Sequence, residues 1–266
     1  MSESRVEQTF SRLRVQGRKG LIPFLAAGDP SLETTAALVR EFEDRGADLV
    51  EIGVPFSDPL ADGVVNQRAY QRALAAGASL SRVLDLVKNI RRHSEIPVVL
   101  MSYVNPIHRF GFDRFPMAAR DAGVDGLILS DCPPEEMNGF SDELVNAGVA
   151  PIILVAPTSP DRRISLINDR GRGYIYYVSL RGVTGTREQL PADLQDGIRR
   201  IRALTKLPVA VGFGISTPVQ AEVVARLADA VIVGSAIVAT IEDNQGRPDL
   251  VSRTGQFLAT LRFAID

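Results

Sequence analysis

Eight short apolar runs, many of them rich in β-branched residues, recur at fairly even intervals along the 266-residue chain. They cover residues 21–27, 48–54, 97–103, 126–130, 151–157, 174–179, 208–214 and 230–238. The runs show no alternation of apolar and polar positions, which is typical of strands buried on both faces in a parallel sheet. We therefore predict eight parallel strands.

Segments with the 3.6-residue period of an amphipathic helix lie between several of these runs. In SLETTAALVREFEDRG (31–46), Leu38, Phe42 and the alanines share one helical face, Ser31 is a suitable N-cap, and Gly46 follows the last turn. The same periodicity occurs in residues 79–93, 190–205 and 217–228. A glycine and a short link then precede the next strand, as in DRGADLVEIG. The chain therefore alternates strand and helix.

Eight strand–helix units in about 250 residues is the count of a (β/α)8 TIM barrel. A doubly wound open sheet is the alternative fold, but it calls for G-x-G-x-x-G after the first strand, where this chain has AAGDPS. We predict one barrel domain over residues 1–266. Within this domain, an amphipathic N-terminal helix in residues 1–16 precedes the first strand, and the loop after the second strand is enlarged and carries an extra helix.

Composition excludes few functions, but it indicates the cellular compartment and the kinds of partner. A net charge of −2 argues weakly against nucleic acid or an anionic membrane as the main partner, because those favour a basic surface. Cys132 is the only cysteine, so no intrachain disulfide forms, which fits a reducing compartment. No apolar run reaches the roughly 18 residues of a membrane span, and the first residues lack a signal-peptide core. We expect a soluble cytoplasmic protein.

The stretch VEIGVPFSDPLADG (50–63) holds the strongest chemical signal. Glu51 interrupts an apolar strand, where a carboxylate pays a large desolvation cost unless it is paired or lies at the open end of the barrel. Burial there raises its pKa toward neutrality, which suits proton transfer. Alternatively, Glu51 points outward to an arginine, Asp58 and Asp62 only cap turns, and Tyr176 on the sixth strand is plain core.

Three glycine-rich stretches fall at the ends of the sixth, seventh and eighth strands, at residues 181–186, 212–216 and 233–236. Glycines let backbone N–H groups approach an anion, and a phosphate site after strands 7 and 8 is frequent in barrels. Each stretch alone is also compatible with a simple tight turn. No lysine lies within a predicted strand and no histidine has a partner at metal-ligand spacing, which favours chemistry by carboxylates and hydrogen bonds.

The motifs PFLAAGDP, EIGVPFSDPLADG, RGVTG, GFGIS and GSAIV, in this order, closely resemble the tryptophan synthase alpha subunit along nearly the whole chain. The resemblance implies a barrel lyase that cleaves indole-3-glycerol phosphate to indole and glyceraldehyde 3-phosphate by a retro-aldol reaction in L-tryptophan biosynthesis. It implies no cofactor in this chain. Its partner is a pyridoxal-phosphate beta subunit, in a hetero-tetramer of two alpha and two beta chains.

The resemblance also implies roles for individual residues. Glu51 and Asp62 match the two catalytic acids, and Tyr176 matches a tyrosine that supports the glutamate. The matching substrate-binding residues are Phe24, Thr184, Gly185, Phe213, Gly214, Gly234 and Ser235. The residues that match surfaces facing the beta subunit are Pro55, Asp58, Asn105 and Pro133.

Some positions depart from the family pattern, and other functions remain open. Val64 and Asn66 replace a proline and an apolar residue near the indole, and Leu180 and Arg181 replace small or hydroxyl residues before GVTG. One alternative is a stand-alone lyase of the same chemistry without a beta partner. Another is a non-catalytic barrel that activates the beta subunit allosterically, and a third is another phosphate-binding barrel of tryptophan or histidine synthesis.

Overall fold

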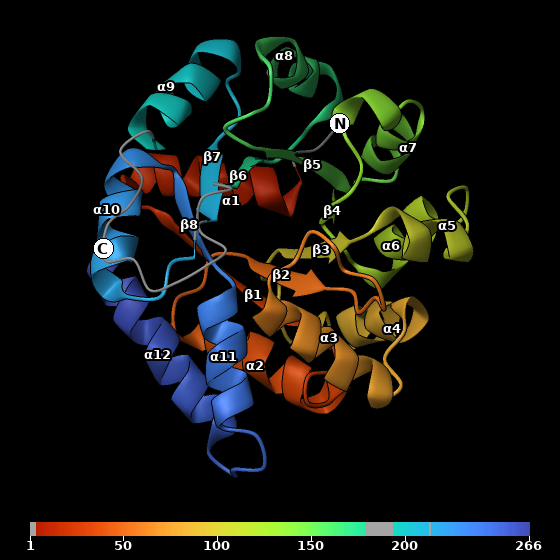
Figure 1. Ribbon diagram of the computed structural model, residues 1–266, viewed down its shortest axis with the longest axis vertical. Coiled ribbons are helices and arrows are strands. Elements are labelled where there is room, and N and C mark those ends of the chain that lie inside the picture. The colour runs from red at the N-terminus through yellow and green to blue at the C-terminus, as the bar shows by residue number, and fades with distance from the viewer. Residues whose placement is uncertain (1–3, 179–193, 213) are drawn as a thin grey trace.

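Eight parallel strands pair in chain order, and the last pairs with the first to close a barrel (Figure 1). The structure is a computed structural model that describes residues 4–178, 194–212 and 214–266. The strands are β1 (Gly20–Ala26), β2 (Val50–Gly53), β3 (Val98–Ser102), β4 (Gly126–Leu129), β5 (Ala150–Val155), β6 (Ile175–Val178), β7 (Val209–Gly212) and β8 (Ala230–Val233). The predicted TIM barrel is confirmed.

Two apolar layers explain why the strand sequences do not alternate. On β1, Leu21 and Leu25 pack outward against the helices, whereas Ile22 belongs to the cluster that fills the barrel interior. On β2, Val50 and Ile52 lie in the outer layer. Because side chains alternate along a strand, Glu51 between them points into the barrel.

The helices surround the barrel in the order expected of alternating units (Figure 1). Those after β1 to β4 are α2 (Leu32–Asp44), α3 (Val64–Ala75), α4 (Leu80–Ile90), α5 (Val104–Phe110), α6 (Phe115–Ala122), the 3-10 turn η1 (Pro134–Glu136) and α7 (Phe140–Asn146). Those after β5 to β8 are α8 (Asp161–Arg170), α9 (Leu194–Leu204), α10 (Pro218–Leu227), α11 (Ser235–Asp243) and α12 (Leu250–Ile265). None of these described helices has the length and hydropathy needed to cross a membrane.

The N-terminal helix α1 (Arg5–Gln16) forms as predicted and covers the amino ends of the strands. Ser4 and Glu7 form a reciprocal capping box that satisfies free N–H groups of the first turn. The ring of Phe10 lies 5.4 Å from that of Tyr174, with both side chains buried. The helix therefore seals the floor of the barrel.

The C-terminal part of the chain differs most from the sequence prediction. The predicted last strand, 230–238, ends at Val233, because Ile237, Val238 and Ile241 occupy the buried face of α11 at helical spacing. No element was predicted after residue 238, yet α12 packs against α2, α10 and α11. The enlarged second unit is confirmed, with α3 as the extra helix and Ser79 as the N-cap of α4.

Candidate active site

Glu51 is completely buried in the barrel interior. Its Oε1 accepts a 2.5 Å hydrogen bond from the hydroxyl of Tyr174, which precedes β6 on another side of the barrel. Its Oε2 has no hydrogen-bond partner among the described residues. Desolvation raises the pKa of Glu51 to about 8, and the bond from Tyr174 offsets this in part. The carboxyl is therefore mostly protonated at neutral pH, and the outward pairing with an arginine is wrong.

Asp62 lies in the loop between β2 and α3, held by three side chains. The Tyr103 hydroxyl donates a 2.6 Å hydrogen bond to Oδ2, and Nδ2 of Asn66 donates one of 3.1 Å to Oδ1. Gln67 donates a 2.8 Å hydrogen bond to the Asp62 carbonyl. Burial raises the pKa of Asp62 while the two donors to its carboxylate lower it. These donors favour the charged form, so the loop holds an oriented carboxylate rather than a simple turn cap.

Glu51 and Asp62 both lie close enough to the phenols of Tyr70 and Tyr176 for their charges to raise the pKa values of these phenols. Burial raises the pKa of Tyr176, and the charges of Glu51 and Asp62 raise it further. The pKa of Tyr70 on α3 is raised by burial and by both carboxylates as well. Interactions of this kind weaken with distance. The two acids thus lie near one shared region of the interior.

Tyr176, which the resemblance assigns to support of the glutamate, makes no hydrogen bond to Glu51 among the described residues. The hydroxyl bonded to Glu51 belongs to Tyr174, two residues earlier, and Tyr176 lies against Gly212 of the neighbouring strand β7. A Cβ on Gly212 would fall 2.6 Å from the Tyr176 ring. Tyr176 therefore lines the space that both acids border, while Tyr174 supports the glutamate.

An apolar wall lies beside Glu51, because Phe24 is the partner of Glu51 in the register of β1 and β2. Phe24 on β1 belongs to a buried cluster with Tyr70 and Val238, and Val65 and Met101 pack against it. A Cβ on Gly53 would fall 2.7 Å from the Phe24 ring and 2.5 Å from the Tyr70 hydroxyl. Gly53 therefore leaves room for both aromatic rings. The predicted role of Phe24 at an indole fits this position.

The amino terminus of α11 lies at the same end of the barrel. Gly234 is its N-cap and makes no side-chain capping bond. A Cβ added to Gly234 would lie 3.6 Å from the ring of Phe24, so the two residues are neighbours. The first N–H groups of a helix lack intrahelical partners and attract anions. Ser235 and Gly214 are both exposed. The backbone of Gly214 is in the left-handed region, with φ 51°. Thr184, Gly185, Phe213, Leu180 and Arg181 lie outside the described residues.

The predicted partner-facing residues follow β2, β3 and β4. Asp58 and Asn105 are exposed, Pro133 is half-buried, and Pro55 is buried. Asp131 accepts a 2.8 Å hydrogen bond from the Val104 N–H, which ties the third and fourth loops together. The exposed positions that suit a partner contact are thus Asp58 and Asn105, whereas Pro55 shapes its loop from within.

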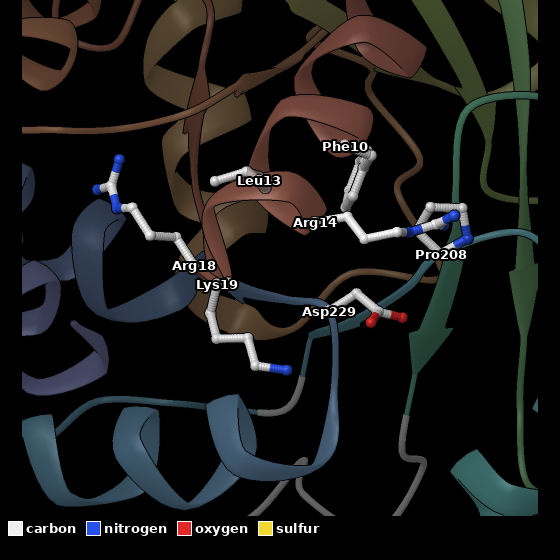
Figure 2. Close-up of a pocket in the computed structure, with 8 residues that line it drawn as sticks. Phe10, Leu13, Arg14, Arg18, Lys19, Pro208 and Asp229 are labelled. Carbon is white, nitrogen blue, oxygen red and sulfur yellow. The ribbon is translucent and has the colours of Figure 1, made fainter.

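A cavity of about 180 Å³ lies at the opposite end of the barrel (Figure 2). Its lining includes Phe10, Arg14, Lys19 and Asp229. Lys19 Nζ donates a 2.8 Å hydrogen bond to the Ala228 carbonyl, and Asp229 accepts one of 2.9 Å from the N–H that opens β7. These contacts join the amino ends of strands, a face that serves stability in barrels. The cavity belongs to the floor.

Enzymes of the (β/α)8-barrel class carry their active sites at the carboxyl ends of the strands, where the Asp62 loop and the start of α11 lie, and this chain is one of them. Residues 10–262 match the family model for the tryptophan synthase alpha chain. A tryptophan synthase alpha chain from Burkholderia thailandensis is 49% identical over 265 residues, which are 99% of this chain and 97% of that relative. The chain belongs to the tryptophan synthase alpha chain family.

Solved structures agree in fold along the chain. Tryptophan synthase subunit alpha from Legionella pneumophila superposes with a TM-score of 0.94 at 40% identity, covering 100% of this chain and 99% of that one. A chain of the tryptophan synthase a2b2 complex from Pyrococcus furiosus, described for its mutual activation, gives a TM-score of 0.86 at 37% identity. It covers 92% of this chain and 98% of that chain.

Sequence reasoning missed four side chains of this region: Tyr70, Tyr103, Tyr174 and Gln67. Tyr174 opened the predicted strand 174–179 and shares a strand face with Tyr176, but the resemblance assigned a role to Tyr176 alone. Tyr103 was the last residue of a predicted strand. The available signal was composition, since Tyr70, Tyr103, Tyr174 and Tyr176 are four of only five tyrosines in the chain. A cluster of phenols indicates polar contacts inside an apolar barrel.

Proposed function

We propose that this chain cleaves indole-3-glycerol phosphate to indole and glyceraldehyde 3-phosphate with Glu51 and Asp62 as its acid–base pair. The reaction is that of the family to which the chain belongs. The observation that carries the residue assignment is the buried, protonated Glu51 with an unpartnered Oε2, beside a second, hydrogen-bonded carboxylate. Two carboxyl groups in different environments suit one proton donor and one charged partner.

Glu51 would deliver the proton that starts the cleavage. The bond between indole C3 and the glycerol chain breaks only when C3 gains a proton, which gives an indolenine cation that can accept the bonding electrons. A carboxyl whose pKa is about 8 still holds its proton at neutral pH. After the transfer, Glu51 is a carboxylate. It then takes the proton of the glycerol hydroxyl as the aldehyde forms, so the group returns to its starting state.

Asp62 would stabilise the charge that appears on the ring. Protonation at C3 places positive charge near the indole N–H, and a fixed carboxylate hydrogen-bonded to that N–H lowers the barrier. The Tyr103 and Asn66 hydrogen bonds hold the Asp62 carboxylate in place before substrate arrives. Asn66, which departs from the family pattern, would thus help to orient the Asp62 carboxylate in this chain.

The phosphate would anchor the far end of the substrate. The free N–H groups at the start of α11, with Gly234 as N-cap, supply an anion site next to Phe24. Binding energy gained at the phosphate orients the bond that reacts. Thr184, Gly185, Phe213 and Gly214 are proposed to complete this site from the sixth and seventh loops.

A beta subunit is proposed to dock on the loops after β2 and β3. Asp58 lies there with Leu60, whose side chain is 91% exposed, and with Val64, which is 65% exposed. Large exposed apolar side chains beside a charge are typical of a protein interface. Asn105 on α5 and Pro133 extend the same surface. This favours an alpha2beta2 assembly over the stand-alone lyase and leaves pyridoxal phosphate to the partner.

The chain is further proposed to be a single-domain cytoplasmic enzyme. No step of the mechanism above needs a cofactor bound to this chain. The single cysteine fits a cytoplasmic enzyme. The closed sheet, built from the first to the last third of the chain, supports a single domain.

Indole release tests the proposal and separates its alternatives. We expect the wild-type chain to release indole slowly from indole-3-glycerol phosphate and faster with a beta subunit added. Asp62→Asn and Glu51→Gln are each expected to lower kcat by at least about a hundredfold. Unchanged release by both variants would favour a non-catalytic barrel or a different site. No acceleration on mixing with a beta subunit would favour the stand-alone lyase.

A further inference from the structure

Asp29, in the loop after β1, forms a two-pronged ion pair with Arg72 of α3. Nε of Arg72 lies 2.9 Å from Oδ1 and Nη2 lies 2.8 Å from Oδ2. Asp29 is only 1% exposed. Gln245, which follows α11, donates a further 2.9 Å hydrogen bond to Oδ1. A buried carboxylate is therefore held by groups from helix α3 and from the turn after α11.

Arg72 also binds the end of α11. Its Nη1 lies 2.7 Å from Oε1 of Glu242, and Arg68, one turn earlier on α3, grips the same carboxylate at 2.9 Å and 2.7 Å. The helices α3 and α11 pack against each other and against β1, and Figure 1 shows them side by side. Arg72 is the one residue of this network that binds both acids, so it joins all three elements.

Each joined element carries one part of the proposed substrate site. Helix α3 begins two residues after Asp62 and holds Asn66, which donates to that carboxylate. Helix α11 begins at Ser235, at the proposed phosphate site. Strand β1 carries Phe24 of the apolar wall. Among the described residues, the hydrogen bonds of this ionic network reach none of those proposed to contact substrate, so the network lies behind the site.

We propose that Arg72 is a positioning residue that fixes the distance between the phosphate anchor on α11 and the indole-binding carboxylate ahead of α3. This inference rests on the proposed function. Because the anchor and the reacting bond belong to one substrate, a shift of one helix against the other misplaces the bond relative to Glu51 and Asp62. Loss of Arg72 should therefore harm reaction of phosphorylated substrate in particular.

The geometry calls for arginine at this position. Three nitrogens of its planar guanidinium bond to two carboxylates, which the rigid fork allows and the single ammonium of lysine does not. Arg72→Lys keeps the charge and much of the volume. It therefore tests the spacing without removing the cation, and it covers the case in which Arg72→Met fails to fold.

The experiment runs the reaction in reverse with two aldehydes. The wild type, Arg72→Met, Arg72→Lys and the control Arg226→Met condense indole with glyceraldehyde 3-phosphate or with glyceraldehyde, and kcat and KM are measured for each. Arg226 forms an exposed ion pair with Glu222 on α10. Arg226→Met therefore makes the same change of residue type outside the Arg72 network. For both Arg72 variants we expect kcat/KM with the phosphorylated aldehyde to fall on the order of ten- to a hundredfold. The value with glyceraldehyde, and both values for the control, should stay close to wild type.

The outcomes separate this inference from the proposed function. A wild type that condenses indole with neither aldehyde contradicts the proposed function itself. A wild type that is active, with Arg72 variants that lose the same factor on both aldehydes or on neither, overturns the positioning role. An equal loss on both aldehydes is what general destabilisation of the fold produces.

Discussion

The hydroxyl of Tyr174 donates a 2.5 Å hydrogen bond to Oε1 of Glu51 in the interior of the barrel. Both side chains are completely buried, and Oε2 of Glu51 has no partner in the part of the chain that the structure describes. Burial disfavours the charged form, so the pKa of Glu51 rises to about 8. The proposed proton donor for the indole carbon thus holds its proton before substrate binds.

The pH profile of indole release should report this donor. If protonated Glu51 is required, kcat falls as pH rises through a value near 8. The bond from Tyr174 favours the charged form, so Tyr174→Phe should move this descending limb to higher pH. Tyr176→Phe is the matched control, because Tyr176 is not among the groups that shift the pKa of Glu51, and the limb should stay in place. A limb that moves in Tyr176→Phe and not in Tyr174→Phe would restore the role first predicted for Tyr176.

Burial of Glu51 should also lower the free energy of unfolding as the pH rises above about 4.5. Between its ordinary pKa of 4.5 and its raised value of about 8, the unfolded chain releases a proton that the folded chain keeps. The free energy of unfolding therefore falls by about 1.4 kcal/mol for each pH unit in this range and is level above it. Glu51→Gln should remove that slope and unfold at higher denaturant concentration at pH 8. Urea titrations at pH 5 and pH 8 measure this, and equal midpoint changes at both pH values would contradict it.

Tyr103 should set the acid side of the profile. Its hydroxyl lowers the pKa of Asp62, which burial raises, and the mechanism needs Asp62 ionised. Tyr103→Phe should therefore shift the ascending limb of kcat against pH to higher pH. Phe56→Leu controls for lost packing, because the Phe56 ring lies 5.3 Å from that of Tyr103 and makes no bond to Asp62. The same shift in both variants would show that packing, rather than the hydrogen bond, sets the limb.

Gly53 should control the space for the indole. An alanine there places a Cβ within 2.7 Å of Phe24 and 2.5 Å of the Tyr70 hydroxyl, so both rings must move. We expect Gly53→Ala to raise the KM for indole in the reverse reaction by about tenfold or more. Gly63→Ala tests the loss of a nearby glycine alone, since nothing lies within 4 Å of its added Cβ. A normal KM in Gly53→Ala would remove Phe24 and Tyr70 from the indole wall.

The barrel could be predicted because burial on both faces leaves a direct mark on the strand sequences. The end of β8 could not, since Ile237 and Val238 continue an apolar run that only helical packing interprets. Glu51 was found because a carboxylate on an apolar strand is costly. Its partner Tyr174 was not, because the bond joins residues 123 positions apart and depends on the three-dimensional closure of the sheet.

The network of Asp29, Arg72 and Glu242 shows the same limit. Each residue alone is an ordinary surface charge in a helix or loop pattern. The contact between α3 and α11 brings them together across 170 residues of sequence, and only the folded chain shows that one arginine binds both acids.

A crystal structure with a non-cleavable indole-propanol phosphate bound tests the account most directly. We predict the indole nitrogen within hydrogen-bonding distance of the Asp62 carboxylate, the Glu51 carboxyl facing C3, and the phosphate on the first N–H groups of α11 at Gly234 and Ser235. An indole ring bound away from both carboxyl groups, or a phosphate held elsewhere than at α11, would contradict the shared site of Glu51 and Asp62.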